Sequence, residues 1–205
     1  MSTVIFDFDG TLADSFRVFI DIAYEVSGRT EPLPKPEIAR LRGMRPLDIM
    51  KDLDIKTWQI PFLAFRGRRQ MRKQMDRVQV FAGMPELVAK LAKNGHQLYI
   101  MSSNSVRNIE PFLQRYNMNT EFIKIYGNVG IFAKARLLKR VLRQNKLAAN
   151  SAYYICDEVR DVVAAQAARV CSIAVSWGYN DTTILEAHQP DFLAHKPSDI
   201  LKFVK

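Results

Sequence analysis

Short runs of β-branched and aromatic residues alternate along the chain with segments whose apolar residues recur at helical spacing. The apolar runs predict six strands, at residues 3–6, 96–101, 121–125, 152–156, 170–175 and 191–194. Helical spacing predicts helices over residues 84–94, 106–117, 132–145 and 159–169. Strands that alternate with single helices are typical of βαβ units. The pattern therefore predicts an α/β fold with a Rossmann-like parallel sheet, covered by helices on both faces.

The stretch from residue 15 to residue 80 breaks this alternation. It shows no convincing strand, but amphipathic helical pieces occur at residues 16–27, 36–41, 46–53 and 57–75. The connector at residues 30–36 is rich in proline, which cannot continue a helix. We therefore expect a helical domain over residues 15–80, inserted between the first two strands of a core formed by residues 1–14 and 81–205.

Composition and charge narrow the class of protein. With 205 residues, 48% of them hydrophobic, the chain can bury a core, which excludes disordered and low-complexity classes. Cys156 and Cys171 lie in apolar runs, so we expect neither a disulfide framework nor a thiolate zinc site, and a reducing cytoplasmic compartment. No apolar run is long enough to span a membrane, and no basic segment followed by an apolar stretch indicates a signal peptide.

The net charge of +9 favours anionic partners such as phosphate esters or nucleic acid, or is simply a solvated basic surface. The densest basic run, residues 66–73, has no interleaved aromatic residues on which bases could stack. Nucleic acid is therefore not the expected partner.

Two carboxylates, Asp7 and Asp9, directly follow the first strand and precede Gly10 and Thr11. Like charges this close repel each other unless a cation or a proton compensates them. A divalent cation would compensate them and favours oxygen ligands. A carboxylate so placed can also attack phosphorus and form an aspartyl-phosphate. The structural alternative is a turn, in which Asp and Gly are common.

Polar residues also follow the second strand and begin a later helix. Ser102 can donate a hydroxyl hydrogen bond to a phosphoryl oxygen, helped by the backbone N–H groups of the turn at Ser103 and Asn104; the alternative is a helix cap at Ser105. Lys134 stands at a predicted helix start, where the helix dipole disfavours a cation. A lysine there is explained if it neutralises a nucleophile and an incoming phosphate; the alternative is a surface lysine.

An acidic cluster, Asp157, Glu158 and Asp161, follows the fourth strand. Carboxylates of this kind supply the hard oxygen ligands that Mg²⁺ prefers. Because the carboxyl ends of parallel strands share one edge of a sheet, we expect these acids to converge with Asp7, Asp9 and Ser102.

The string Asp7-Phe8-Asp9-Gly10-Thr11-Leu12-Ala13-Asp14-Ser15 resembles the first motif of the haloacid dehalogenase superfamily, in its phosphatase branch. Three further motifs follow in the order of that family, around Ser102, Lys134 and Asp157, and the resemblance covers nearly the whole chain. A true dehalogenase lacks the second Asp of the first motif. The resemblance therefore implies phosphate chemistry and Mg²⁺ as the cofactor.

The resemblance also implies roles for single residues. Asp7 is the nucleophile, and Asp9 is the general acid and base, with a backbone carbonyl that helps to hold Mg²⁺ beside the Asp7 carboxylate. Ser102 and Lys134 bind the phosphoryl group, and Ser103 is a weaker candidate for the same task. Asp157 binds the ion directly, whereas Asp161 orients a metal-bound water, a role that Glu158 could share. Many relatives have Gly where Cys156 stands, which we interpret as a small buried filler.

By the same resemblance, residues 15–80 form a cap of the C1 type. The string Leu41-Arg42-Gly43-Met44-Arg45 resembles the cap loop that contacts substrate in phosphoglycolate-phosphatase-like and β-phosphoglucomutase-like members. Arg42 with Gly43 is thus expected to determine substrate specificity by binding a second anionic group such as a carboxylate, and Arg45 is a further candidate. The alternative for both arginines is an exposed linker charge.

The leading hypothesis is a magnesium-dependent phosphatase that hydrolyses a small phosphomonoester, such as a phosphoglycolate-like metabolite. A sugar phosphomutase of the same fold is disfavoured, because the mutases of this family tend to carry a His soon after the first motif and this chain has none there. A non-catalytic basic protein that binds RNA or an acidic partner is disfavoured too, since a pure binder needs neither Asp7 nor Asp9.

Overall fold

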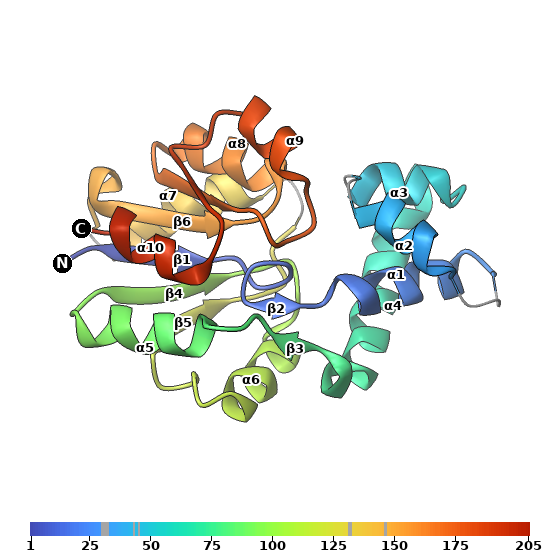
Figure 1. Cartoon of the computed structure of the whole chain (residues 1–205), viewed down its shortest axis with the longest axis horizontal. Coiled ribbons are helices and arrows are strands. Elements are labelled where there is room, and N and C mark those ends of the chain that lie inside the picture. Colours follow the sequence, from blue (N-terminus) through green and yellow to red (C-terminus); the bar gives the residue numbers. More distant parts are fainter. Residues whose placement is uncertain (30–32, 43, 45, 131–132, 146) are drawn as a thin grey trace.

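A parallel sheet of six strands forms the centre of the larger part of the molecule (Figure 1). The computed structural model describes residues 1–29, 33–42, 44, 46–130, 133–145 and 147–205. Along the sheet the strand order is β5-β4-β1-β6-β7-β8. The bounds are β1 Thr3–Phe6, β4 Gln97–Met101, β5 Phe122–Tyr126, β6 Ala152–Cys156, β7 Cys171–Val175 and β8 Phe192–Ala194. All six predicted strands are confirmed, with ends that shift by one residue at most.

Helices cover both faces of this sheet, as its buried strands require. One face carries α5 Met84–Lys93, α6 Val106–Arg115 and α10 Pro197–Phe203, and the other carries α7 Lys134–Gln144, α8 Val159–Ala168 and α9 Thr182–Ala187. Successive residues of β1 serve opposite faces: Val4 and Phe6 pack with α5 and α6, whereas Ile5 packs with α7 and α8. The helices α9 and α10 were not predicted, because both are short.

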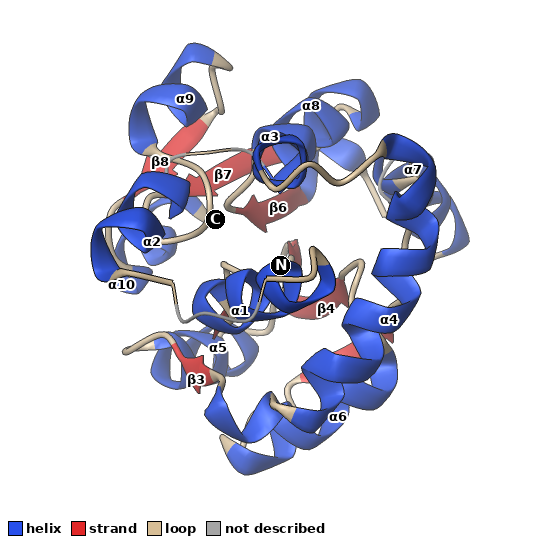
Figure 2. Ribbon diagram, turned by 90° about the vertical axis from the view of Figure 1, so that its right-hand side faces the viewer, coloured by secondary structure: helices blue, strands red, loops and turns tan. Residues whose placement is uncertain are grey.

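The chain between β2 and β3 is almost entirely helical and has its own apolar core. It comprises α1 Phe16–Val26, α2 Lys35–Arg42, α3 Pro46–Asp52, the 3-10 turns η1 Thr57–Gln59 and η2 Met75–Arg77, and α4 Ile60–Lys73. Phe16, Ile20, Leu41 and Ile49 are buried together there. We call α1–α4 the helical module. It lies at the end of the molecule toward which the strands of the sheet run, and Figure 2 views the molecule from that side.

A short two-stranded ribbon connects the helical module to the sheet domain. Strand β2, Ala13–Asp14, pairs antiparallel with β3, Gln79–Val80, so the chain leaves and re-enters the sheet domain side by side. The expectation that residues 15–80 contain no strand is therefore wrong at Gln79 and Val80. Two residues are too few to produce a visible alternation, and the partner strand lies within the first motif.

The helices that the structure describes are all too short or too polar to cross a lipid bilayer.

Candidate active site at the carboxyl edge of the sheet

Asp7 occupies the centre of the site because β1 is the central strand of the three that supply its residues. The register pairs Phe6 with Ile100 of β4 and with Ile155 of β6. The backbone N–H of Asp7 donates to the carbonyl of Ile155 at 2.9 Å, which continues the ladder one residue beyond the strand. The Asp7 carboxylate is buried, and its Oδ1 accepts a hydrogen bond from the N–H of Phe8 at 2.7 Å. Asp7 thus lies between the segments that follow β4 and β6.

A buried lysine faces this carboxylate. Lys134 is the first residue of α7, and its Nζ lies 2.6 Å from Asp7 Oδ2 and 2.7 Å from Asp161 Oδ1. Its side chain is only 2% exposed, so it is not the surface lysine of the alternative interpretation. Although burial opposes its charge, Asp161 and Asp7 raise the pKa of Lys134 and keep it protonated. The cation can therefore neutralise charge beside Asp7.

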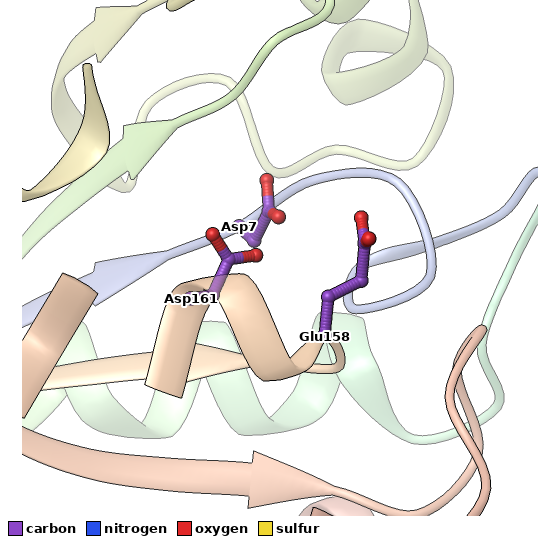
Figure 3. A group of neighbouring side chains, drawn as sticks. All are labelled: Asp7, Glu158 and Asp161. Carbon is purple, nitrogen blue, oxygen red and sulfur yellow. The ribbon is translucent and has the colours of Figure 1, made fainter. Parts of the chain in front are cut away.

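Three acids form a tight cluster around Asp7. Ligand oxygens of Asp7, Glu158 and Asp161 all lie within 4.8 Å of one another, and all three residues are buried. Figure 3 shows Asp7 at the end of β1 and Glu158 and Asp161 at the start of α8, with their carboxylates extending to the same side. Glu158 also forms an ion pair with Arg160. Glu158 therefore belongs to the cluster around Asp7. The sequence had suggested only that it could share the role of Asp161.

Asp157 is fully buried beside this cluster, between two glycines. Its Oδ1 accepts from the Thr11 hydroxyl at 2.9 Å, and its Oδ2 accepts from the N–H of Tyr179 at 2.8 Å. A Cβ at Gly10 would lie 2.0 Å from Asp157 Oδ2, and a Cβ at Gly178 would lie 2.1 Å from Asp157 Cβ. Both positions therefore require glycine. The hydrogen bonds fix the orientation of the carboxyl group, as outer-shell partners do for metal ligands.

The electrostatics of the site show an excess of negative charge. Burial, followed by the charge of Glu158, raises the pKa of Asp157 to about 8. Burial also raises the pKa of Asp7 well above its ordinary value, despite Lys134. Although burial opposes its ionisation, Lys134 and Arg160 lower the pKa of Asp161, and its Oδ2 accepts no hydrogen bond from the described residues. A divalent cation fits this set of residues, because its charge would compensate the surplus negative charge and the carboxylates offer the hard oxygen ligands that it prefers.

Asp9 points to a different set of partners. Nδ2 of Asn104 donates to both carboxylate oxygens of Asp9, at 3.2 Å to Oδ1 and 3.0 Å to Oδ2. Burial raises the pKa of Asp9, and hydrogen bonding by Ser15 and Asn104 opposes the rise. A carboxyl group with a raised pKa, held in place beside Asp7, is suited to general acid and base chemistry.

Ser102 lies at the end of β4, the strand that pairs with β1. It is buried, and its Oγ accepts a hydrogen bond from the N–H of Asn104 at 3.0 Å, which leaves the hydroxyl proton free for another acceptor. The N–H of Ser102 itself donates to the carbonyl of Tyr126 at 2.9 Å. Ser103 is only partly buried. The geometry therefore favours Ser102 over Ser103 as a hydroxyl donor.

Arg42, the candidate specificity residue that the structure describes, is not part of the acidic cluster. Arg42 is 45% exposed, its Nη2 lies 4.0 Å from Asp14 Oδ1, and its guanidinium lies 4.8 Å from the centroid of the Phe16 ring. These contacts join α2 to the region where the chain enters the helical module. Gly43 and Arg45 lie outside the described residues.

Two features of the site were not predicted from the sequence. One is the side chain of Asn104, which binds Asp9, whereas only the backbone amide of Asn104 was expected to contribute. The other is Asn108, which donates to Asn104 Oδ1 at 2.8 Å. A signal was present for Asn108: it is a polar residue next to Ile109, on the apolar face of a strongly amphipathic helix. No sequence signal indicates where the Asn104 side chain points, because the turn after β4 decides this.

The family model for haloacid dehalogenase-like hydrolases matches residues 4–175, a range that includes Asp7, Ser102, Lys134 and Asp157. The chain belongs to the haloacid dehalogenase-like hydrolase family. It is 35% identical to a phosphoglycolate phosphatase of Synechococcus elongatus over 100% of this chain and 97% of that protein. It is 26% identical to a 5'-nucleotidase of Pseudomonas aeruginosa, over 91% of this chain and 88% of that protein. It is also similar to the pyrophosphatase PpaX of Bacillus cereus, with 23% identity over 98% of this chain and 95% of that protein.

The fold agrees with that of a solved member of the family. A haloacid dehalogenase-like family hydrolase from Streptococcus pneumoniae superposes with a TM-score of 0.81, covering 100% of this chain and 99% of that chain at 23% identity. The α/β class and the family resemblance inferred from the motifs are thus confirmed.

Proposed function

We propose that this chain is a magnesium-dependent phosphatase that hydrolyses a small phosphomonoester through an aspartyl-phosphate on Asp7. The ion pair of Asp7 with the buried Lys134, at 2.6 Å, is the observation that carries this proposal most directly. A nucleophilic carboxylate next to a fixed cation is the arrangement that brings a phosphate dianion to an anionic nucleophile.

In the first step a carboxylate oxygen of Asp7 attacks phosphorus in line with the leaving oxygen. A bond from phosphorus to the Asp7 oxygen forms, the bond to the leaving alcohol oxygen breaks, and Asp9 gives that oxygen its proton. Lys134 and the Ser102 hydroxyl stabilise the charge on the remaining phosphoryl oxygens. The products of this step are the free alcohol, phosphorylated Asp7 and ionised Asp9.

In the second step Asp9, now a carboxylate, accepts a proton from a water molecule that attacks phosphorus. The bond between phosphorus and the Asp7 oxygen breaks, inorganic phosphate leaves, and both acids return to their starting forms. One residue can serve as acid and then as base because its proton is lost in the first step and regained in the second.

Asp7 and Asp157, with the backbone carbonyl of Asp9, would hold Mg²⁺, and Glu158 and Asp161 complete the acidic surroundings. Bound there, the ion supplies positive charge to the phosphoryl oxygens. We assign Asp157 as a direct ligand because its carboxyl group is fully buried and is oriented by Thr11 and the Tyr179 amide.

The substrate class is proposed from the relatives. Phosphoglycolate phosphatase, 5'-nucleotidase and pyrophosphatase are all names of hydrolases, which favours hydrolysis over transfer to a sugar. The relative with 35% identity favours a phosphoglycolate-like substrate, and Arg42 and Gly43 stay the candidates for binding its second anionic group. The cytoplasmic location stays a prediction, for which the two free cysteines are the support.

The test is phosphate release from a panel of small phosphoesters, with and without Mg²⁺. Wild type is compared with Asp7→Asn and with Asp76→Asn, a control at an exposed carboxylate outside the site. We expect magnesium-dependent release by wild type and by the control only, and a protein-bound phosphoryl group detectable by mass in wild type. Phosphate release by Asp7→Asn at the wild-type rate would contradict the mechanism.

A second measurement tests the assignment of the ligands. Asp157→Asn should raise the Mg²⁺ concentration needed for half-maximal activity more than Glu158→Gln does. The reverse order would make Glu158, which belongs to the 4.8 Å cluster with Asp7, the direct ligand.

A further inference from the structure

Helix α6 contacts both the proposed active site and the helical module. Its first turn follows Asn104, which binds Asp9, and Nδ2 of Asn108 on that turn donates to the backbone carbonyl of Arg68 in α4 at 3.1 Å. Near its other end, Arg115 donates to the carbonyl of Met75 at 2.9 Å. The helical module and the 3-10 turn η2 that follows it therefore each contact α6 through one of these hydrogen bonds, and the contact at Asn108 lies two hydrogen bonds from Asp9.

Asn104 is held by hydrogen bonds on all its polar groups. Its Oδ1 accepts from the N–H of Ser105 and from Nδ2 of Asn108, both at 2.8 Å. Its own N–H donates to Ser102 Oγ at 3.0 Å, and its carbonyl accepts from the N–H of Asn128 at 2.7 Å. A flip of the amide would direct its NH₂ group toward two donors. Asn104 is therefore fixed with Nδ2 directed at the Asp9 carboxylate.

Asn108 is the residue that connects this amide to the helical module. It is 1% exposed and lies among apolar residues of α6, where an amide is costly unless it is hydrogen-bonded. Its two Nδ2 hydrogens serve Asn104 Oδ1 and the Arg68 carbonyl. If α4 moved away from α6, Asn108 would lose one of these acceptors, and the support that it gives to Asn104 would weaken.

We propose that Asn104 and Asn108 are positioning residues for Asp9, and that Asn108 makes the orientation of the Asp9 carboxylate depend on the seating of α4 against α6. This rests on the proposed function, in which Asp9 protonates the leaving oxygen. Asp9 is then correctly placed only while the helical module is seated on α6. Neither asparagine transfers a proton: Asn104 acts on the Asp9 carboxylate that does, and Asn108 acts through Asn104.

The proposal predicts a dependence on the leaving group. An alkoxide leaves poorly without a proton, whereas p-nitrophenolate needs little help from an acid. The ratio kcat/KM covers the steps up to departure of the alcohol, so the later hydrolysis of the phosphorylated Asp7 does not enter it. A misplaced Asp9 should therefore lower kcat/KM for an alkyl phosphate by ~10–100-fold and for p-nitrophenyl phosphate by less than about 3-fold.

The experiment measures kcat/KM for 2-phosphoglycolate and p-nitrophenyl phosphate with wild type, Asn104→Ala, Asn108→Ala and the double variant. Gln114→Ala, an exposed position on the same helix, is the control. We expect the selective loss with both single variants, and a double variant no worse than Asn104→Ala, because Asn108 acts through Asn104. Should Asn108→Ala fold poorly, Asn108→Leu keeps the volume but removes both donors, and the same pattern is expected.

An equal loss for the two substrates, or no loss with either Asn108 variant, would overturn the link. These outcomes are separate from failure of the proposed function itself, which would be seen in wild type or in Asp7→Asn whatever happens at Asn108.

Discussion

Removing the charge of Lys134 is the sharpest test of the electrostatics of the site. At an effective dielectric constant near 20, each of its two ion pairs corresponds to about 6 kcal/mol of attraction at the 2.6 and 2.7 Å separations. Desolvation of the three charges offsets most of this attraction. What remains after Lys134→Met is two buried carboxylates without their cation. Breaking a buried pair in this way costs about 3–5 kcal/mol of the free energy of unfolding.

The loss of unfolding free energy caused by Lys134→Met should depend on pH, and the burial of Asp7 and Asp161 determines the sign of that dependence. Without Lys134, the folded-state pKa values of Asp7 and Asp161 rise, so the folded variant binds protons more readily than the unfolded chain. A carboxyl group of this kind destabilises the fold as pH rises from its unfolded to its folded pKa, by up to about 1.4 kcal/mol per pH unit. We expect a deficit of about 3–5 kcal/mol at pH 8 and about 1–2 kcal/mol at pH 5.

The assay is urea unfolding of the metal-free protein in EDTA, followed by far-UV circular dichroism at both pH values. Lys139→Met is the matched control, because Lys139 is an exposed lysine of the same helix, and it should change the free energy of unfolding by less than about 0.5 kcal/mol at either pH. A Lys134→Met deficit that is the same at pH 5 and pH 8 would refute the reasoning, since it would show that the loss comes from packing.

Three further substitutions test other parts of the site. Gly10→Ala should lower the free energy of unfolding by about 2–4 kcal/mol, because a Cβ there would lie 2.0 Å from Asp157 and φ is +77°. Gly95→Ala is the control: φ is +84° but the space around it is open, so it should lower the free energy of unfolding by only about 1–2 kcal/mol. Equal losses would show that the contact with Asp157 does not matter. Asp157→Asn should make the metal-free protein more stable than wild type at pH 8 but not at pH 4, since the pKa of Asp157 is raised to about 8. Urea titrations at both pH values measure this. A difference in the free energy of unfolding that is the same at both pH values would contradict it. Arg42→Ala should change the free energy of unfolding by less than about 1 kcal/mol, because Arg42 is exposed and its contact with Asp14 is 4.0 Å long. It should raise KM for 2-phosphoglycolate more than KM for p-nitrophenyl phosphate. Equal KM changes would show that Arg42 takes no part in substrate recognition.

The sheet could be predicted from the sequence chiefly because its central strands β1, β4, β6 and β7 are buried apolar runs with clear ends. Residues 152–156 match strand β6 at both ends, since Ala152 begins and Cys156 ends a run that polar residues enclose. Strand β3 could not be found in this way, because Gln79–Val80 owes its conformation to pairing with β2 and not to its own pattern. The family could be recognised from four short motifs, and the parallel sheet brings the residues of these motifs to one edge.

The side-chain geometry of the site was predicted less completely than its location. The sequence could place Asp7 and Lys134 in one site, because Asp7 follows the end of a predicted strand and Lys134 stands at the start of a predicted helix. It cannot tell that Glu158 joins the 4.8 Å cluster while Asp157 turns to Thr11 and Tyr179, because consecutive residues at a helix start point in different directions. The partner of Asp9 likewise depends on the turn at Asn104, and a turn of a few residues leaves no periodic pattern.

The order of the strands explains why the helical module lies where it does. From β1 the sheet extends through β4 and β5 on one side and through β6, β7 and β8 on the other. Segments that leave adjacent strands in opposite directions open a crevice at the carboxyl edge, where ligands bind in sheets of this kind. Asp7 lies at this point, and the chain that follows it, through Asp9 and β2, leads directly into the module. A covering element that begins at Phe16, directly after β2, can exclude water from the nucleophile. The hydrogen bond from Asn108 to Arg68 adds a contact by which the far end of that element reaches Asp9.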